Sequence, residues 1–518
     1  MGKVSRLLAA RALERPGSAA FLRGVDGATL TWRGLAAQAE RWRRLAAVRD
    51  VSERGRVGLV VDDPLAFAAA YLGCLAAGLT AVPMDPRSSS RELGAALSRT
   101  AVEVLATDRP GVIPFPSGID VWDVSAYDGG PRAVAPTRRV RCTGGARPGD
   151  GRALRPAVLL TSSGTTGRPK GIPLSEWQLV HAARRVVRHH RLGPTERGYT
   201  PLPLFHVNAQ VIGVLATLVS GGSLVVDRRF DADAYWERVA RWRPTWLNAV
   251  PAILTSLAER PGPPDAVAAR VRFARSASAP LPPATLAAFE QRTGIGVLET
   301  YGMSEAAGQI TANPLERAAR RAGSVGRPVG IGLTVVTGDG RPAAVGEEGA
   351  VMLNGRAVVS RYLDLADSGR ESTRPARTGS GWLPTGDVGV RDEEGFLYLA
   401  GRADDVINRG GEKIHPLEVE NVLLSHPAVA SAAVVGAPHP RLGQVPVAFL
   451  TARHGAGHEG DARREALIGE LRVLCEERLV RYKRPTAINV ARTLPLGPTG
   501  KVLRRSLRAG LATAGGVV

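Results

Sequence analysis

The sequence Thr161-Ser-Ser-Gly-Thr-Thr-Gly-Arg-Pro-Lys170-Gly171 stands directly after a short apolar run, residues 157–160, that has the composition of a β-strand. Two glycines in this segment allow backbone N–H groups to turn toward an anion, and the hydroxyls and Lys170 add further donors and a positive charge. It is not a Walker A loop, because its lysine is followed by glycine and not by a serine or threonine that opens a helix. The segment predicts a strand leading into a polyphosphate-binding loop. The specific order of its residues disfavours an ordinary polar surface loop.

The chain on both sides of this loop alternates short β-rich runs with helical patterns. The expected strands are residues 57–61, 80–83, 222–226, 245–250 and 271–274, and the expected helices are residues 64–77, 232–243 and 283–293. Strand–helix–strand units with short links predict a layered α/β fold with parallel sheet.

Two later regions do not follow this alternation of strands and helices. Residues 324–399 are rich in glycine and contain short strand candidates, which predicts a small β-subdomain. From about residue 401 the pattern gives a helix at 416–424, strands at 429–435 and 445–450, and a second helix with leucines at i, i+4 and i+7. We therefore expect an N-terminal domain over residues 1–400 and a small, mobile α+β domain over residues 401–518.

The composition excludes several classes of protein. The chain has 518 residues and a net charge of +20, and only five of its 68 basic residues are lysine (Lys3, Lys170, Lys413, Lys483 and Lys501). A nucleic-acid-binding protein is the alternative that this charge suggests, but the arginines are spread along the chain and aromatic residues make up only 5%. The nucleic-acid hypothesis is therefore disfavoured.

Location and membrane contact follow from the same composition. The start of the chain lacks the apolar core of a secretory signal, and the longest apolar stretches are shorter than the roughly 20 residues that span a bilayer. The cysteines Cys74, Cys142 and Cys475 are far apart, without metal-ligand or disulfide spacing. We expect a soluble cytoplasmic protein, monomeric or homodimeric, that does not insert into membranes.

Four further motifs follow the loop in the chain. They are Thr300-Tyr-Gly-Met-Ser-Glu305, Gly381-Trp-Leu-Pro-Thr-Gly-Asp387, the stretch from Gly401-Arg402 to Gly410-Gly-Glu-Lys-Ile414, and Pro495-Leu-Gly-Pro-Thr-Gly-Lys501. With the loop, they resemble the ordered signatures of the adenylate-forming superfamily, which contains acyl-CoA synthetases, peptide-synthetase adenylation domains and firefly-type luciferases. The resemblance extends from about Leu30 to Leu507.

The resemblance implies a reaction in which a carboxylate attacks the α-phosphate of ATP and expels pyrophosphate. Negative charge grows on phosphorus and on the leaving group, so catalysis depends on positioning and on cations. The implied cofactors are ATP and Mg²⁺, with CoA or a carrier-protein phosphopantetheine as second substrate. The implied catalytic residues are Lys501, Glu305, His206 and Ser304, with Glu305 also the metal ligand. The implied ATP and AMP contacts are Thr161, Ser162, Ser163, Gly164, Thr165, Thr166, Lys170, Ser278, Ala279, Pro280, Thr300, Tyr301, Gly302, Met303, Asp387 and Arg402.

The resemblance also implies a second half-reaction. The small domain would rotate about Asp404 after adenylation and present a thiol tunnel formed by Gly410, Gly411, Glu412 and Lys413. Residues 478–518 carry nine basic residues and no acid. They form either a solvated basic tail or a docking surface for the 3′-phosphate of CoA.

The implied acid pocket consists of Phe205, His206, Asn208, Gln210, Ala277, Gly302 and Ala307. Amino-acid-activating relatives have aspartate at the position of His206, so an α-amino acid is disfavoured. Many relatives have glycine at the position of Ala277, and the extra methyl group favours a small or flat acid. We expect an acyl-CoA ligase for a small, aryl or medium-chain acid. The alternatives in natural-product pathways are loading of a carrier protein and diazotisation of an arylamine with nitrite through nitrite-AMP.

Overall fold

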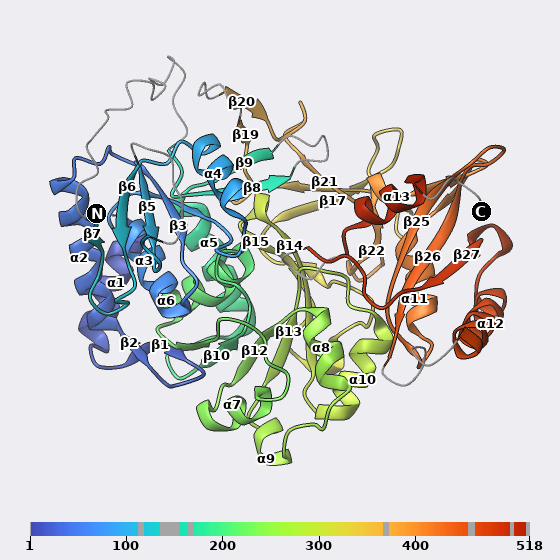
Figure 1. Cartoon of the computed structure of the whole chain (residues 1–518), viewed down its shortest axis with the longest axis horizontal. Helices are drawn as coiled ribbons and strands as arrows, with labels where there is room; N and C mark the ends of the chain where they lie inside the picture. Colours follow the sequence, from blue (N-terminus) through green and yellow to red (C-terminus); the bar gives the residue numbers. More distant parts are fainter. Residues whose placement is uncertain are drawn as a thin grey trace.

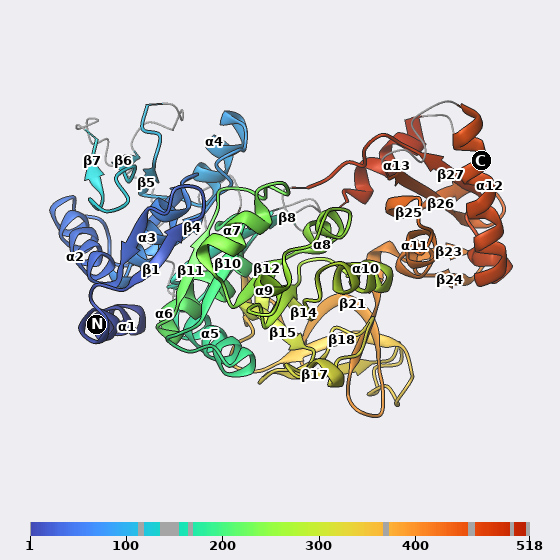
Figure 2. The same cartoon turned by 90° about the horizontal axis from the view of Figure 1, so that it is seen from below.

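The computed structural model describes residues 2–111, 119–134, 155–163, 169–365, 372–453, 461–497 and 502–513. It confirms the expected α/β class, with a large N-terminal part and a small C-terminal unit. The C-terminal unit lies at one end of the molecule (Figure 1). A quarter turn of the view keeps it at that end, far from helices α1 (Lys3–Glu14) and α2 (Trp32–Val48) (Figure 2). No helix in the described ranges is long and apolar enough to cross a membrane.

Two nine-stranded sheets form the N-terminal part. The first sheet has the order β16 (Arg327–Pro328), β15 (Gly308–Ala312), β14 (Val297–Met303), β13 (Phe273–Ser276), β12 (Trp246–Ala249), β10 (Arg197–Thr200), β11 (Ser223–Val226), β1 (Ala19–Arg23), β2 (Thr29–Thr31). Its six central strands, from β14 to β1, pair in parallel, and the strands at both edges are antiparallel. The predicted strands at 222–226, 245–250 and 271–274 are β11, β12 and β13, so the parallel-sheet prediction is confirmed.

The second sheet contains the strand that enters the predicted phosphate loop. Its order is β20 (Ser372–Pro375), β19 (Arg361–Asp364), β9 (Pro169–Leu174), β8 (Val158–Ser163), β4 (Thr80–Pro83), β3 (Arg56–Val60), β5 (Val104–Thr107), β6 (Asp120–Asp123), β7 (Arg132–Ala133). Strands β8, β4, β3, β5 and β6 pair in parallel with one another, and the outer strands of the sheet are antiparallel. The predicted strands at 57–61 and 80–83 are β3 and β4.

Helix α3 (Pro64–Ala76) lies between the two sheets. It contacts β1 and β2 of the first sheet and β3 and β4 of the second. Every residue from Pro64 to Leu75 is buried, which explains why the sequence here is continuously apolar and lacks an amphipathic pattern. Asp63 starts the helix by accepting a hydrogen bond from the backbone N–H of Ala66 at 2.9 Å. The other helices of this part are α4 (Ser90–Arg99), α5 (Glu176–His190), α6 (Ala216–Ser220), α7 (Tyr235–Trp242), α8 (Pro251–Ala258), α9 (Asp265–Ala268) and α10 (Pro283–Thr293).

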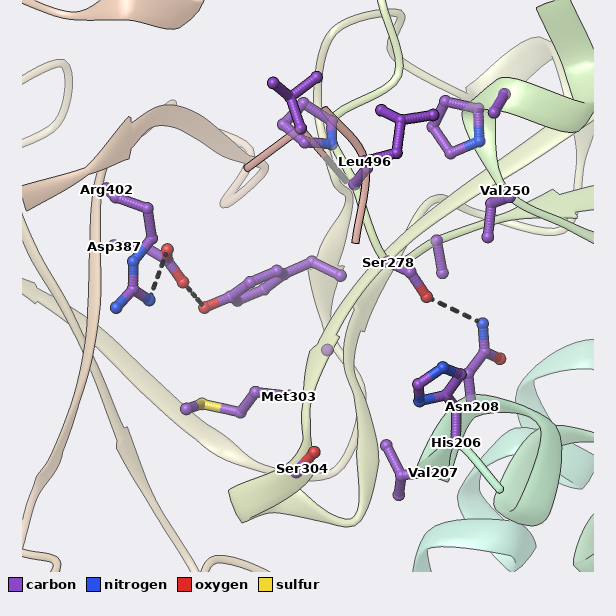
Figure 3. Close-up of a pocket in the computed structure, with 18 of the residues that line it drawn as sticks. His206, Val207, Asn208, Val250, Ser278, Met303, Ser304, Asp387, Arg402 and Leu496 are labelled. Carbon is purple, nitrogen blue, oxygen red and sulfur yellow. Dashed lines mark hydrogen bonds and ion pairs between the residues drawn. The ribbon is translucent and has the colours of Figure 1, made fainter. Parts of the chain in front are cut away.

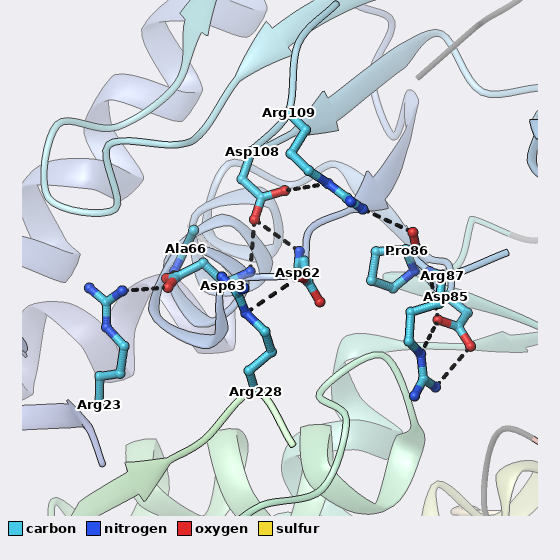
Figure 4. Close-up of polar contacts among 10 residues, drawn as sticks. All are labelled: Arg23, Asp62, Asp63, Ala66, Asp85, Pro86, Arg87, Asp108, Arg109 and Arg228. Atoms are coloured by element: carbon cyan, nitrogen blue, oxygen red, sulfur yellow. Dashed lines mark hydrogen bonds and ion pairs between the residues drawn. The ribbon is translucent and has the colours of Figure 1, made fainter. Parts of the chain in front are cut away.

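A polar cluster joins the carboxyl ends of neighbouring strands (Figure 4). The carboxylate of Asp108, after β5, accepts hydrogen bonds from the backbone N–H groups of Asp62 and Asp63, after β3, at 3.0 and 2.7 Å. Arg228, which follows β11, lies 3.4 Å from the carboxylate of Asp62, and Arg23 pairs with Asp63 at 2.8 Å. These contacts fix the two sheets against each other at the edge where the loops of the candidate site begin.

The predicted β-subdomain is present as a separate antiparallel sheet, but part of its range belongs elsewhere. This sheet has the order β17 (Gly332–Val336), β18 (Gly349–Asn354), β21 (Leu383–Arg391), β22 (Leu397–Arg402). Strands β19 and β20 fall within residues 324–399 and yet extend the second large sheet, where Leu363 pairs with Gly171. Strand β22 continues to Arg402, past the expected boundary at residue 400, so the break in structure comes at the turn Ala403–Asp405.

The C-terminal unit has its own apolar core. Its strands are β23 (Ile407–Arg409), β24 (Glu412–Ile414), β25 (Val429–His439), β26 (Gly443–Ala452) and β27 (Ala487–Val490), and its helices are α11 (Pro416–Leu424), α12 (Asp461–Arg478) and α13 (Arg504–Thr513). Leu467 and Leu471 of α12 pack with Val419 of α11 and Val434 of β25, apart from the core of the N-terminal part. The predicted leucine spacing therefore marks the face of α12 that covers this sheet.

Candidate active site

One large cleft, of about 2460 Å³, lies between the N-terminal part and the C-terminal unit. Most of the described residues that the motifs predict line it. They are Lys170, His206, Asn208, Ala277, Ser278, Ala279, Pro280, Thr300, Tyr301, Gly302, Met303, Ser304, Glu305, Asp387, Arg402 and Asp404. Figure 3 shows Asp387 and Arg402 at one side of this space, and His206, Asn208 and Ser278 at the other. We call these the nucleotide side and the acyl side.

The nucleotide side is organised around Asp387. The hydroxyl of Tyr301 donates to one carboxylate oxygen of Asp387. Arg402 Nη1 lies 3.2 Å from the other carboxylate oxygen (Figure 3). The same Arg402 nitrogen donates to the carbonyl oxygen of Thr385 at 2.9 Å. Burial and the neighbouring carboxylate raise the pKa of Tyr301, so this hydroxyl keeps its proton. A carboxylate and a guanidinium held together in this way suit the hydroxyls and phosphates of a nucleotide.

The glycines of two motifs are required by close contacts. Gly386 has φ = +78°, and a Cβ there would lie 2.6 Å from Arg402 Nη2. A Cβ at Gly302 would lie 2.3 Å from the carbonyl oxygen of Gly308 on the neighbouring strand β15. Both positions require glycine, because a Cβ would press on the Arg402 side chain at Gly386 and on the backbone of β15 at Gly302.

Glu305 is held by Lys170 and Tyr362 at the base of the cleft. Its Oε1 accepts hydrogen bonds from Lys170 Nζ at 2.8 Å and from the hydroxyl of Tyr362 at 3.2 Å. The Lys170 ammonium also lies 4.0 Å from the centre of the Tyr362 ring. Among the described residues no cluster of three or more His, Cys, Asp or Glu could hold a metal. One carboxylate beside a phosphate loop fits Mg²⁺, which takes few protein ligands and binds substrate phosphates.

The acyl side depends on a π-helix that the sequence did not indicate. Helix η1 (Asn208–Leu215) begins with Gln210 N–H donating to the carbonyl of His206 at 3.0 Å, and Gln210 Nε2 donates to the carbonyl of Phe205 at 2.7 Å. Asn208, at its first position, donates from Nδ2 to Ser278 Oγ at 3.2 Å (Figure 3). Ser278 itself has φ = +75°, a backbone conformation that is unusual for a residue other than glycine. The wide turn of η1 thus places a side-chain amide in the cleft.

Several predicted residues lie elsewhere. Gln210 is fully buried and, as described, supports the backbone of Phe205, and neither residue lines the cleft. Ala307 is buried at φ = +55° behind Glu305, so it too is not a pocket residue. The proposed tunnel residues Gly410, Gly411, Glu412 and Lys413 form the exposed turn and second strand of the β23–β24 hairpin, away from the cleft.

Part of the prediction falls on residues that are not described. Gly164, Thr165, Thr166 and Lys501 lie outside the described ranges, as does Cys142. Thr161, Ser162 and Ser163 belong to β8, whose pairing with β9 brings the loop's two ends together. Leu496, the second residue of the lysine motif, and Val502, directly after it, both line the cleft and pair with each other. Lys483, the other lysine near the C-terminus, pairs with Glu418 at 2.7 Å.

The turn after β22 is attached to the last helix. Arg508 of α13 lies 2.8 Å from the carboxylate of Asp405, and Arg504 of the same helix pairs with Asp405 at 3.8 Å and with Glu420 at 2.6 Å. Asp404, the predicted hinge, lines the cleft beside them. The segment that follows Lys501 in the chain is therefore joined directly to the turn between the two parts.

Arg275 is a cleft residue that the sequence motifs did not predict. Arg275 lies on the central strand β13, is 2% exposed and lines the cleft. The sequence does contain a signal for it. Arg275 stands between Phe273-Ala274 and Ser276-Ala277, and a charged side chain in such a segment is seldom buried unless it has a partner or a function. Tyr362, which contacts both Lys170 and Glu305, was also missed, since no motif includes it.

The fold and the cleft define a nucleotide-dependent enzyme with two structural parts. Residues 8–363 match the family model of the AMP-binding enzymes, and residues 418–501 match that of the AMP-binding enzyme C-terminal domain. The chain belongs to the AMP-binding enzyme family.

The individual proteins that this chain resembles are CoA ligases and synthetases. The chain is 38% identical to a sulfoacetate–CoA ligase of Cupriavidus necator, with 97% of each chain covered. It is 31% identical to an oxalate–CoA ligase of Arabidopsis thaliana, over 89% of this chain and 90% of that one. The o-succinylbenzoate CoA synthetase of Bacillus subtilis, solved with ATP and a magnesium ion, is 28% identical, has a TM-score of 0.77 and covers 97% of this chain and 98% of its own.

The reaction class follows from the family and the site. The protein is an ATP-dependent, AMP-forming ligase, which activates a carboxylic acid as an acyl-adenylate and transfers the acyl group to CoA. ATP, with magnesium, is the nucleotide substrate. The alternatives with a nitrite substrate or an RNA or DNA partner receive no support from these relatives.

Proposed function

We propose that this ligase acts on a short, polar carboxylic acid. The observation that carries the proposal is the acyl side of the cleft, where Asn208 and Ser278 present polar atoms beside His206. An alkyl chain bound there would exclude water from the Asn208 amide and the Ser278 hydroxyl without replacing the hydrogen bonds to water, which is unfavourable for polar groups. The sulfoacetate and oxalate ligases that this chain resembles are named for short acids with a second polar group, which supports the proposal.

We further propose the roles of the site residues. Lys501 would stabilise the charge that develops on the α-phosphate and on the acyl oxygens, and Ser304 would donate to the α-phosphate. Glu305 would bind Mg²⁺. When the β- and γ-phosphates of ATP bind the Lys170 ammonium, the contact between Lys170 and Glu305 would weaken and the carboxylate would become available to the metal. Asp387 would accept the ribose hydroxyls, and Arg402 would hold Asp387 in place.

The second half-reaction would use the C-terminal unit. Rotation at Asp404 would withdraw Lys501 and bring the hairpin Gly410–Lys413, which lies outside the cleft here, to the thiol of CoA. The enzyme would work in the cytoplasm, where its buried free cysteines Cys74 and Cys475 stay reduced. If the acyl group were transferred to a carrier protein and not to CoA, the enzyme would need a docking surface for that protein near the hairpin Gly410–Lys413.

Pyrophosphate release with ATP and Mg²⁺, measured across a panel of acids with and without CoA, tests the proposal. The panel contains acetate, octanoate, benzoate, sulfoacetate, oxalate and nitrite. We expect the highest kcat/KM for a short polar acid and formation of its CoA thioester. A clear preference for octanoate or benzoate would contradict the proposed acid. AMP release with nitrite and an arylamine, without CoA, would contradict the proposed acceptor.

A further inference from the structure

The acyl side of the cleft contains a buried cation that the proposed roles leave unused. Nη1 of Arg275 donates to the side-chain oxygen of Asn208 at 2.9 Å and to that of Asn248 at 3.1 Å. Its Nε is buried and has no hydrogen-bond partner within the described part of the chain. The hydrogen bonds of the guanidinium nitrogen Nη1 thus go to two uncharged side-chain amides.

No negative charge balances Arg275 among the described residues. Burial and the charge of Arg275 lower the pKa values of His189 and His190, so these rings favour the neutral form and bring no further charge to the site. Burial without a carboxylate lowers the pKa of Arg275 to about 9. A buried charge without a partner is unfavourable, and a ligand of opposite charge would remove that penalty.

Arg185 shows how this chain satisfies a buried arginine that has only a structural role. Arg185 is 6% exposed and also has no acidic partner among the described residues, but it donates to the backbone carbonyls of Gln309 and Val329 at 3.2 and 2.9 Å. It does not line the cleft. Arg275 differs in lining the cleft and in contacting Asn208, a side chain that lines the cleft as well.

We propose that Arg275 and Asn208 form a subsite for a second anionic group of the acid, a sulfonate or a second carboxylate, and thereby determine substrate specificity. The inference rests on the proposed short polar acid and specifies its charge. Asn208 Nδ2, which donates to Ser278 Oγ at 3.2 Å, is the donor that the anion takes, and Arg275 polarises that amide from behind. Arg275 supplies the charge that distinguishes an anionic substrate from a neutral one of the same shape.

Two acids of matched shape test this subsite. Sulfoacetate carries a sulfonate, and methylsulfonylacetate has a methyl group in place of one sulfonate oxygen and no charge at that end. The measurement is kcat/KM for pyrophosphate release with each acid at saturating ATP, and the readout is the ratio of the two values. We expect the wild-type enzyme to prefer sulfoacetate.

Variants then locate the source of the preference. Arg275→Met should lower the ratio by about 30-fold or more, because it removes the buried positive charge that faces the substrate anion across Asn208. Asn208→Asp should lower it similarly, because the new carboxylate pairs with Arg275 and repels the substrate anion. Arg275→Lys should keep part of the preference. Arg185→Met, the matched control, should lower thermal stability and leave the ratio unchanged.

The outcomes separate this inference from the proposed function. An equal loss of kcat/KM on both acids in Arg275→Met, with ATP-dependent thermal stabilisation retained, would make Arg275 a structural residue and overturn the inference. Release of pyrophosphate with short polar acids but no wild-type preference for the charged one would overturn it too, while the proposed function stands. A wild-type enzyme that rejects both acids and activates only octanoate or benzoate would contradict the proposed function itself.

Discussion

Glu299 supports the sharpest prediction about stability. It lies on β14 directly before the Thr300-Tyr301 motif, is 5% exposed, and its Oε2 has no hydrogen-bond partner among the described residues. Burial raises the pKa of its carboxyl from the ordinary 4.5 to about 8, with one opposing contribution from the backbone of Leu281. The native state therefore keeps this proton up to about pH 8, whereas the unfolded chain releases it near pH 4.5.

The sign and size of the effect follow from proton linkage. Between pH 4.5 and 8 the native state binds more protons than the unfolded state, so the free energy of unfolding falls as pH rises. At about 1.36 kcal/mol for each pH unit, the total cost reaches on the order of 5 kcal/mol above pH 8. About 3 kcal/mol of this falls between pH 6 and pH 9. Glu299→Gln removes the ionisable group, keeps its shape and therefore removes this contribution.

Urea unfolding of wild type and Glu299→Gln, followed by tryptophan fluorescence at pH 6 and pH 9, measures it. The variant should become more stable relative to wild type as pH rises, by about 3 kcal/mol over this range. Glu393→Gln, which changes an exposed carboxylate, should show no such trend. An identical difference between wild type and Glu299→Gln at both pH values would refute the reasoning, because the carboxyl would then not titrate in this window.

Three further substitutions test the catalytic site. Lys501→Ala should lower ATP–pyrophosphate exchange by about 10²–10³-fold, since one donor to the transition state is lost, and near-normal exchange would contradict its assignment. Gly386→Ala adds a Cβ 2.6 Å from Arg402 at φ = +78° and should raise KM for ATP several-fold in a steady-state assay, whereas an unchanged KM would show that the backbone of β21 can adjust. Arg508→Met breaks the 2.8 Å pair with Asp405 and should alter thioester formation more than pyrophosphate exchange, and equal effects on both would argue against a role for this pair in rotation.

Much of the fold was predictable from local patterns. The strand at 80–83 and the helices at 283–293 and 416–424 agree with β4, α10 and α11 to the residue, because apolar periodicity and starting prolines mark their limits. Strands β19 and β20 fall within the range 324–399 that predicted the β-subdomain but extend the second large sheet, because the sheet that an edge strand joins depends on tertiary pairing. The π-helix η1 read as an ordinary apolar run.

Where a motif fixes several side chains at once, the residues that it predicts lie together in the cleft. Asp387 and Tyr301 of the Thr-Gly-Asp and Tyr-Gly motifs line the cleft. Each lies next to a glycine of its strand, Gly386 at a positive φ in β21 and Gly302 where β14 approaches β15. Assignment failed for Gln210 and Ala307, which stand next to pocket residues in the chain but point elsewhere. Neighbouring positions of a helix or a tight turn face different directions, so proximity in sequence does not place a side chain in a pocket.

The sequence by itself determined the family, the chemistry and the local turns of this protein, because those depend on residues that are adjacent in the chain. Only the tertiary structure decided which distant residues meet. Lys170 reaches Glu305 across 135 positions, Tyr301 reaches Asp387 across 86, and Arg275 reaches Asn208 across 67. Such pairs depend on strand order and register in sheets assembled from remote segments, and no local pattern encodes them. The uncompensated charge of Arg275, and with it the proposed specificity for a second anion, is therefore a property of the folded cleft.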